Sequence, residues 1–184
     1  MKHILVVSFL FLQSISNAQP QKSREEKYVL ISSVKKNDRE GPYEMAVANQ
    51  KDIDKLSEPL RGLAAYYTCR IQCDCEFCDT AGHVICGLTS ALGLGQQGSD
   101  KQLAMLKKWF PNDDNVRSAI KNNCSVGSPE GSDFLEYTFL SFNVRNDTVI
   151  VNAEYIHYSH GNTSMLYQKN IAVIKGNRIV FIKR

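Results

Sequence analysis

The chain has 184 residues, of which 43% are hydrophobic and 22% are charged, and its formal net charge at pH 7 is +3. This length suits a single domain that buries its own apolar core. The small positive charge is spread along the chain and gives no electrostatic footprint for nucleic acid. We therefore expect no nucleic acid among its partners.

The first segment is typical of a secretory signal peptide. A basic start precedes an apolar run from 4 to 12, and the small residues Ser16 and Ala18 fit a cleavage site. The run is shorter than the roughly 20 apolar residues that cross a bilayer, and no later segment is long enough either. We expect cleavage of 1–18, a single mature domain over 19–184, no membrane span, and a secreted or periplasmic location.

Two extended segments are predicted next. The residues "KYVLISSV" (27–34) favour a strand, and the charged residues of 35–42 favour a turn. The residues "YEMAVAN" (43–49) favour either a second extended segment or the approach to a helix.

The middle of the chain, about 52–124, is predicted to be helical. Apolar residues recur at three- and four-residue steps in 52–71 and again in 76–92. Because proline lacks an amide donor, Pro59 is expected in the first turn of its helix and not in the interior.

Two further helices are predicted after the glycine-rich stretch 93–98. In "SDKQLAMLKKWF" (99–110), Ser99 and Gln102 form a capping-box pattern that can satisfy free backbone amides. A shorter helix is predicted over 113–124.

The last part of the chain, about 133–183, has the composition of strands. Four runs rich in β-branched and aromatic residues are separated by the turn sequences "RND", "HGN" and "KGN". The runs are 134–144, 148–159, 164–174 and 178–183. We predict an α+β fold in which an N-terminal layer of about three to four helices packs on a four-strand antiparallel meander, braced by disulfides.

Large apolar residues occupy both faces of these predicted strands. In the last strand, for example, Ile179 and Phe181 alternate with Val180 and Ile182. A sheet that is open to water on one side would alternate more cleanly. We infer that the sheet either curves around the helices or meets another surface on its far side.

Helices followed by a meander resemble the nuclear-transport-factor-like (SnoaL-like, cone-shaped α+β) folds. The resemblance lies in the element order over about 52–183 and in the strand rhythm "NDTVIVNAEYIHY…GNTSMLYQKNIAVIKGNRIVFIK". Members of that fold range from enzymes to scaffolds, so the resemblance implies a cone-shaped sheet without implying an activity.

Six cysteines are candidates for disulfides. An even number in an exported chain favours this chemistry because the spaces outside the cytosol are oxidising. A bond from the remote Cys124 to the cluster in 69–78 would close a long loop and stabilise the fold most, by about 4 kcal/mol. The candidates are Cys69, Cys73, Cys75, Cys78, Cys86 and Cys124.

Two other interpretations of these cysteines stay open. Cys73, Cys75 and Cys78 could bind zinc or copper(I), with either Cys69 or His83 as a further ligand, although no second spaced cysteine pair accompanies them. Alternatively, the "CEFC" pair at 75–78 could be redox-active, but its acidic neighbours disfavour a thiolate.

Catalytic motifs are lacking. The sequence contains no serine-hydrolase elbow, zinc-protease motif or phosphate-binding loop. The group "EYIHYSH" (154–160) holds the strongest acid–base candidates: Glu154 on one strand face, with Tyr155 and His157 on the other.

We therefore predict an exported non-catalytic domain that needs no cofactor. It would bind a protein partner or a small ligand through its sheet or a helix-lined cavity, and a second copy of the chain could pair through the sheet. The alternatives are a small cavity enzyme that uses Glu154, Tyr155 and His157, and a cysteine-rich metal-binding protein.

Overall fold

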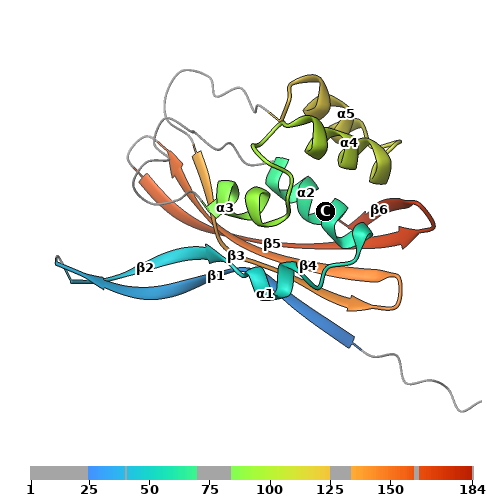
Figure 1. Ribbon diagram of the computed structural model, residues 1–184. Coiled ribbons are helices and arrows are strands. Elements are labelled where there is room, and N and C mark those ends of the chain that lie inside the picture. Colours follow the sequence, from blue (N-terminus) through green and yellow to red (C-terminus); the bar gives the residue numbers. More distant parts are fainter. Residues whose placement is uncertain (1–24, 40, 70–83, 125–133, 160–161, 184) are drawn as a thin grey trace, which may run out of the picture.

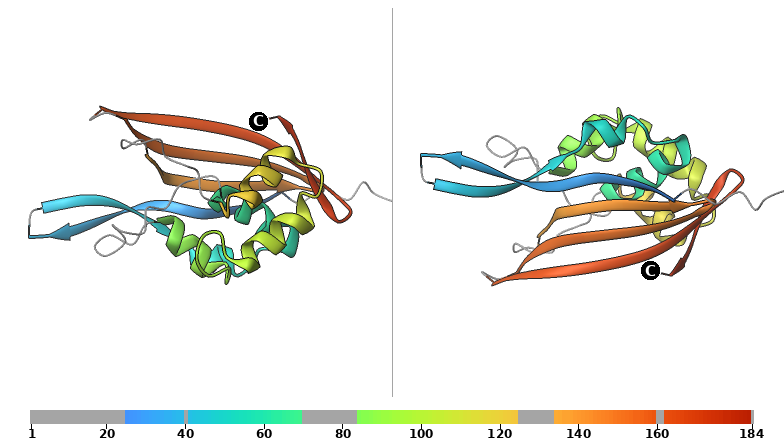
Figure 2. Two further views of the ribbon diagram at one scale, coloured as in Figure 1. Left: turned by 90° about the horizontal axis from the view of Figure 1, so that it is seen from above. Right: turned by 90° about the horizontal axis from the view of Figure 1, so that it is seen from below.

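The computed structural model describes residues 25–39, 41–69, 84–124, 134–159 and 162–183. Its described elements form an α+β fold in which helices lie on one side of an antiparallel sheet (Figures 1 and 2). The helices are α1 (Gln50–Ile53), α2 (Glu58–Cys69), α3 (Val84–Ala91), α4 (Asp100–Trp109) and α5 (Asp114–Lys121). The strands are β1 (Glu25–Asp38), β2 (Gly41–Ala48), β3 (Phe134–Arg145), β4 (Thr148–Ser159), β5 (Asn162–Lys175) and β6 (Arg178–Lys183).

The described strands form one six-stranded sheet in the order β2-β1-β3-β4-β5-β6. The predicted meander is confirmed as β3 to β6, and its tight turns include one at Asn146 with φ 53° and one at Gly176 with φ 60°. The predicted four-strand sheet, however, is too small. The hairpin β1–β2 precedes the helices and extends the sheet, so the predicted order of helices first is wrong.

Strand β1 joins the sheet in two halves. Its first half pairs with β3, and its second half, from Ile31 onward, pairs with β2. A bulge between Val29 and Ile31 separates the halves, and both Leu30 and Ile31 are fully buried there. The carboxylate of Asp52 in α1 accepts a hydrogen bond of 3.0 Å from the Val29 N–H beside this bulge.

Helix α2 is the centre of the core. Pro59 lies in its first turn, as predicted, and every residue from Gly62 to Cys69 is buried. A helix on the surface would bury only one face, so α2 is enclosed between the sheet and α4. Gly62 allows the close contact with α4, because an ideal Cβ there would lie 2.4 Å from the indole Cδ1 of Trp109.

The capping residues of α4 also connect it to α2. The Ser99 side chain accepts from the Gln102 N–H, which confirms the predicted N-cap. Gln102 is fully buried, and its Oε1 accepts from the Gly98 N–H at 2.7 Å. Its Nε2 donates to the Ala65 carbonyl at 3.1 Å and to the Thr68 hydroxyl at 2.8 Å, both in α2.

Two further predicted helices are found in the described residues, but their ends differ from the predicted ones. The predicted helix 113–124 is α5, which begins after Asp113, whose carboxylate accepts from two amides of the first turn. Of the predicted helix 76–92, the structure contains α3, and 76–83 lie outside the described residues.

Candidate functional site

The alternation of side chains gives the sheet two different faces. Val149, Val151 and Ala153 of β4 are buried against the helices, so the even-numbered residues of β4 point to the opposite side. The pairing register places the odd-numbered residues of β5, from Met165 to Val173, beside those even-numbered residues. We call the side away from the helices the outer face.

Large apolar side chains gather on the outer face of β4, β5 and β6. Four of them are strongly exposed: Met165 at 46%, Tyr167 at 73%, Val180 at 38% and Ile182 at 67%. Half-buried aliphatic residues lie beside them in the sheet. Ile156 pairs with Met165, Val173 pairs with Val180, and Ile150 pairs with Ile171. These eight residues are named the outer patch: Ile150, Ile156, Met165, Tyr167, Ile171, Val173, Val180 and Ile182.

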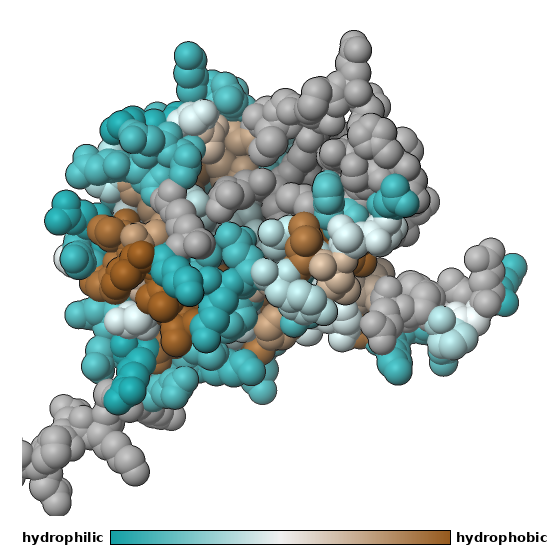
Figure 3. All heavy atoms as spheres, turned by 180° about the vertical axis from the view of Figure 1, so that it is seen from behind, coloured by the Kyte–Doolittle hydropathy of each residue, from teal (hydrophilic) through white to brown (hydrophobic). Residues whose placement is uncertain are grey.

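Figure 3 shows the molecule from the side of these strands. Apolar atoms gather in two places on a surface that is otherwise mostly hydrophilic. Ile182 lies on this face together with Val180, because Phe181 between them pairs with Ala172, which is buried on the helix side.

Basic side chains border the outer patch. Lys169 and Lys175 lie on the outward-facing positions of β5, and Arg178 lies opposite Lys175 at the β5–β6 turn. All three are exposed. On the same face, Glu154 of β4 lies opposite Tyr167. Among the side chains that the structure describes there, the basic groups outnumber the acidic ones.

Strand β5 also has an unpaired edge. Strand β6 pairs only with Ile171–Lys175, and no described strand pairs with the preceding part of β5 on that side. Figure 2 shows β6 beside one end of β5 only. Residues 163–169 of this strand are named the β5 edge. Seven residues of an extended strand span about 23 Å.

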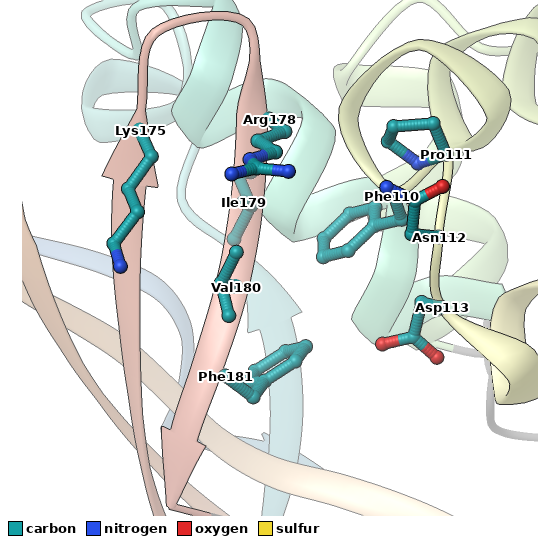
Figure 4. A pocket seen from close by; sticks show the side chains of 9 residues that line it. All are labelled: Phe110, Pro111, Asn112, Asp113, Lys175, Arg178, Ile179, Val180 and Phe181. Carbon is teal, nitrogen blue, oxygen red and sulfur yellow. The ribbon is translucent and has the colours of Figure 1, made fainter.

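A shallow groove lies next to the outer patch. It has a volume of about 370 Å³ and lies between the β5–β6 hairpin and the turn that joins α4 to α5 (Figure 4). The rings of Phe110 and Phe181 lie parallel at its base, with centroids 5.9 Å apart. Lys175 and Arg178 line it on the strand side, and Asp113 lines it on the helix side.

The predicted acid–base residues do not form one cluster. Tyr155 and His157 lie on the helix side of β4, whereas Glu154 lies on the outer face, as the two-residue period of a strand requires. The Tyr155 ring packs edge-on against Tyr137, with ring centroids 5.9 Å apart. The position of Glu154 therefore connects it with the outer patch and not with Tyr155 and His157.

One of the predicted disulfides is present. Cys69 at the end of α2 is bonded to Cys124, which follows α5, across 55 residues of sequence. This pairing joins the remote Cys124 to the cysteine cluster, which is the kind of bond that the sequence indicated would stabilise the fold most. Cys73, Cys75, Cys78 and His83 lie outside the described residues, and so does the side chain of Cys86.

Within the described ranges, no group of three or more histidine, cysteine or acidic side chains is arranged to hold a metal ion. None of the helices in those ranges has the length and apolarity needed to cross a membrane.

Comparisons with known protein families, with curated proteins and with solved structures found no significant match. The resemblance to the nuclear-transport-factor-like folds therefore gains no support from a related structure. The surface described above has to be interpreted from its own geometry.

Apolar residues on both strand faces were predicted from the sequence, but the β5 edge was not. A signal was present, because Met165, Leu166 and Tyr167 are three consecutive large apolar residues in one strand. Since successive residues alternate between faces, such a run must expose apolar surface unless both faces are covered.

Proposed function

We propose that this protein is an exported, disulfide-braced binding domain that docks a protein partner on the outer patch. The observation that supports this function is the gathering of eight apolar side chains on the sheet face away from the helices. Figure 3 shows exposed apolar surface in two places with hydrophilic residues around them, and exposed apolar surface with a polar border is characteristic of interaction sites on soluble proteins. The patch extends over three neighbouring strands and does not form an enclosed cavity, so it suits a folded protein better than a small molecule.

The charges around the patch indicate the kind of partner. Lys169, Lys175 and Arg178 would face acidic residues at the border of a bound protein. Such complementary charges raise the rate of association and exclude wrongly charged partners. The expected partner surface has an apolar centre with acidic residues around it.

Export is part of the same proposal. It is supported by the signal-like segment at the start of the chain and by the Cys69–Cys124 disulfide. Disulfides form and persist in secreted and periplasmic proteins and are rare in the reducing cytosol.

A photocrosslinking experiment in the producing cells tests the proposal. A photoreactive amino acid replaces Ile182, which is exposed at 67% in the outer patch. The matched control carries it at Ala104, which is exposed on α4 on the other side of the sheet. Mass spectrometry identifies the crosslinked protein, and calorimetry with the purified components measures its affinity.

We expect a discrete protein crosslinked from position 182 and not from position 104. Its affinity should fall at least tenfold in Ile182→Lys, because the added ammonium would be buried against an apolar surface. Affinity should also fall as salt is raised, because the border charges are exposed to screening. Equal crosslinking from both positions, or an unchanged affinity in Ile182→Lys, would contradict the proposal.

A further inference from the structure

The β5 edge differs from β2 and β6, the strands at the two ends of the sheet order. Natural proteins protect edge strands with proline, charged residues or bulges, because unpaired backbone groups can pair with another chain. Strand β2 carries Pro42 and Glu44, and β6 carries Arg178, Lys183 and a bulge. From position 163 to position 168, the β5 edge has no proline, no charge and no bulge.

The backbone of the β5 edge is oriented to pair outward at its odd-numbered residues. The Ile174 N–H donates to the Asp147 carbonyl on the side of β4, at 2.8 Å. Backbone groups in an antiparallel strand alternate in direction, so even-numbered residues of β5 point to β4 and odd-numbered residues point away. The outward N–H and C=O groups in the edge are those of Thr163, Met165, Tyr167 and Lys169.

The side chains of this edge are exposed as well. Met165, Leu166 and Tyr167 are exposed at 46%, 38% and 73%. Met165 and Tyr167 lie on the outer face, and Leu166 lies on the helix side of the sheet. Any strand that pairs with the edge would cover apolar surface on both faces at once.

We propose that the β5 edge pairs with the β5 edge of a second copy of this chain. The two strands run antiparallel around a two-fold axis that is perpendicular to the sheet and passes midway between the two Leu166 residues. This register places Met165 opposite Tyr167 of the second copy and Leu166 opposite its counterpart. The outward groups of Met165 and Tyr167 then exchange hydrogen bonds, and the two sheets become one.

The self-pairing is favourable because the edge is complementary to itself. Each apolar side chain of the edge meets an apolar side chain, and such cross-strand pairs stabilise a sheet. The only charge, Lys169, lies opposite Thr163 of the second copy, so no like charges oppose each other. An interface related by a two-fold axis is the commonest arrangement of homo-oligomers.

Introducing charges at Leu166, the residue nearest the two-fold axis, tests this dimer in the full chain. Leu166→Lys places two ammonium groups opposite each other, and Leu166→Glu places two carboxylates there. Like charges directly opposite each other destabilise a strand pair. Multi-angle light scattering measures the mass of the wild-type chain, of each variant alone, and of the two variants mixed. Circular dichroism of each variant verifies that it remains folded.

We expect a dimer for the wild-type chain, monomers for each variant alone, and a dimer for the equimolar mixture. Ile182→Lys, which lies outside the β5 edge, should remain dimeric. This control separates the dimer from the partner-binding proposal, which depends on Ile182 and not on Leu166.

Two results would overturn the inference. The first is a wild-type chain that stays monomeric at every soluble concentration. In that case the β5 edge would pair with a strand of another protein or remain hydrated. The second is a dimer that persists in Leu166→Lys alone, since it would have to use a different surface.

Discussion

The two faces of the sheet bury their apolar residues in different ways. On the inner face, Phe142, Val149 and Val151 are almost completely buried beneath α2 and its neighbours. On the outer face, Tyr167 and Ile182 in the adjacent strands are exposed at 73% and 67%. Both faces use the same residue types, so hydrophobicity alone does not distinguish them. The inner face therefore holds the fold together, whereas the outer face leaves apolar surface exposed to solvent.

Removing the disulfide on the helical side of the sheet should cause the largest loss of stability. We expect Cys69→Ala/Cys124→Ala to lower the free energy of unfolding by about 4 kcal/mol, because the bond closes a long loop in the unfolded chain. Urea denaturation measures the loss. Adding reductant to the wild-type protein should reproduce most of it, and a variant as stable as the oxidised wild type would contradict the expectation.

The buried amide between α2 and α4 should have the next largest effect. Gln102→Ala removes the hydrogen bonds to Gly98, Ala65 and Thr68 and leaves their polar groups buried. We expect a loss of about 2–3 kcal/mol, measured by thermal or urea denaturation. The matched control is Gln96→Ala on the exposed surface nearby, which should stay within about 0.5 kcal/mol of wild type.

A pair of glycine variants tests how closely the inner side is packed. Gly62→Ala would force a methyl group into the Trp109 ring and should cost about 1–3 kcal/mol. In α3, a Cβ at Gly87 would meet only the Ala48 Cβ, at 4.0 Å. There the higher helix propensity of alanine should stabilise the protein by about 0.5–1 kcal/mol. Effects of the same sign in both variants would contradict this account.

Acid should weaken the attachment of α1 to β1. The hydrogen bond from the Val29 N–H, together with the Lys55 ammonium at 3.1 Å, holds the pKa of Asp52 below its usual value near 3.8. A lowered pKa in the folded state means that this stabilisation is complete above about pH 4 and is lost as the pH falls through the folded pKa.

We therefore expect Asp52→Asn to cost about 1 kcal/mol at pH 7 and progressively less at lower pH. Urea denaturation at a series of pH values from 7 to 3 measures the difference. The exposed Asp54→Asn serves as the control and should change stability by less than half as much. A difference between Asp52→Asn and wild type that did not narrow in acid would exclude this role of the carboxylate.

The outer patch should give the smallest change in stability. Ile182→Lys exchanges an exposed side chain, so the free energy of unfolding should stay within about 0.5 kcal/mol of wild type. A loss as large as that of Gln102→Ala would show that Ile182 belongs to the core and would remove the contrast between the two faces.

Local sequence patterns predicted much of the fold. The helix start at Pro59, the N-cap at Ser99 and the hairpin at Gly176 each depend on residues within a few positions of one another. The pairing of β1 with β3 was not predicted, because it joins segments about a hundred residues apart. The pattern in 27–34 indicates a strand but does not say where that strand is paired.

The candidate site was predicted only in outline. Apolar residues on both strand faces indicated either a curved sheet or a second contacting surface, but they did not indicate which face the helices cover. The β5 edge depends on β5 continuing past the end of β6, a difference in strand length that pairing alone reveals. For Tyr155 and His157, the strand period correctly separates them from Glu154.

The Cys69–Cys124 bond has a consequence for the chain in a protease-rich environment. Every peptide bond between these two cysteines lies inside a covalently closed loop. A single cut there would leave both fragments joined, and they would separate on a gel only after reduction. The strands of the sheet, which come from both sides of that loop, would thus remain parts of one molecule after nicking.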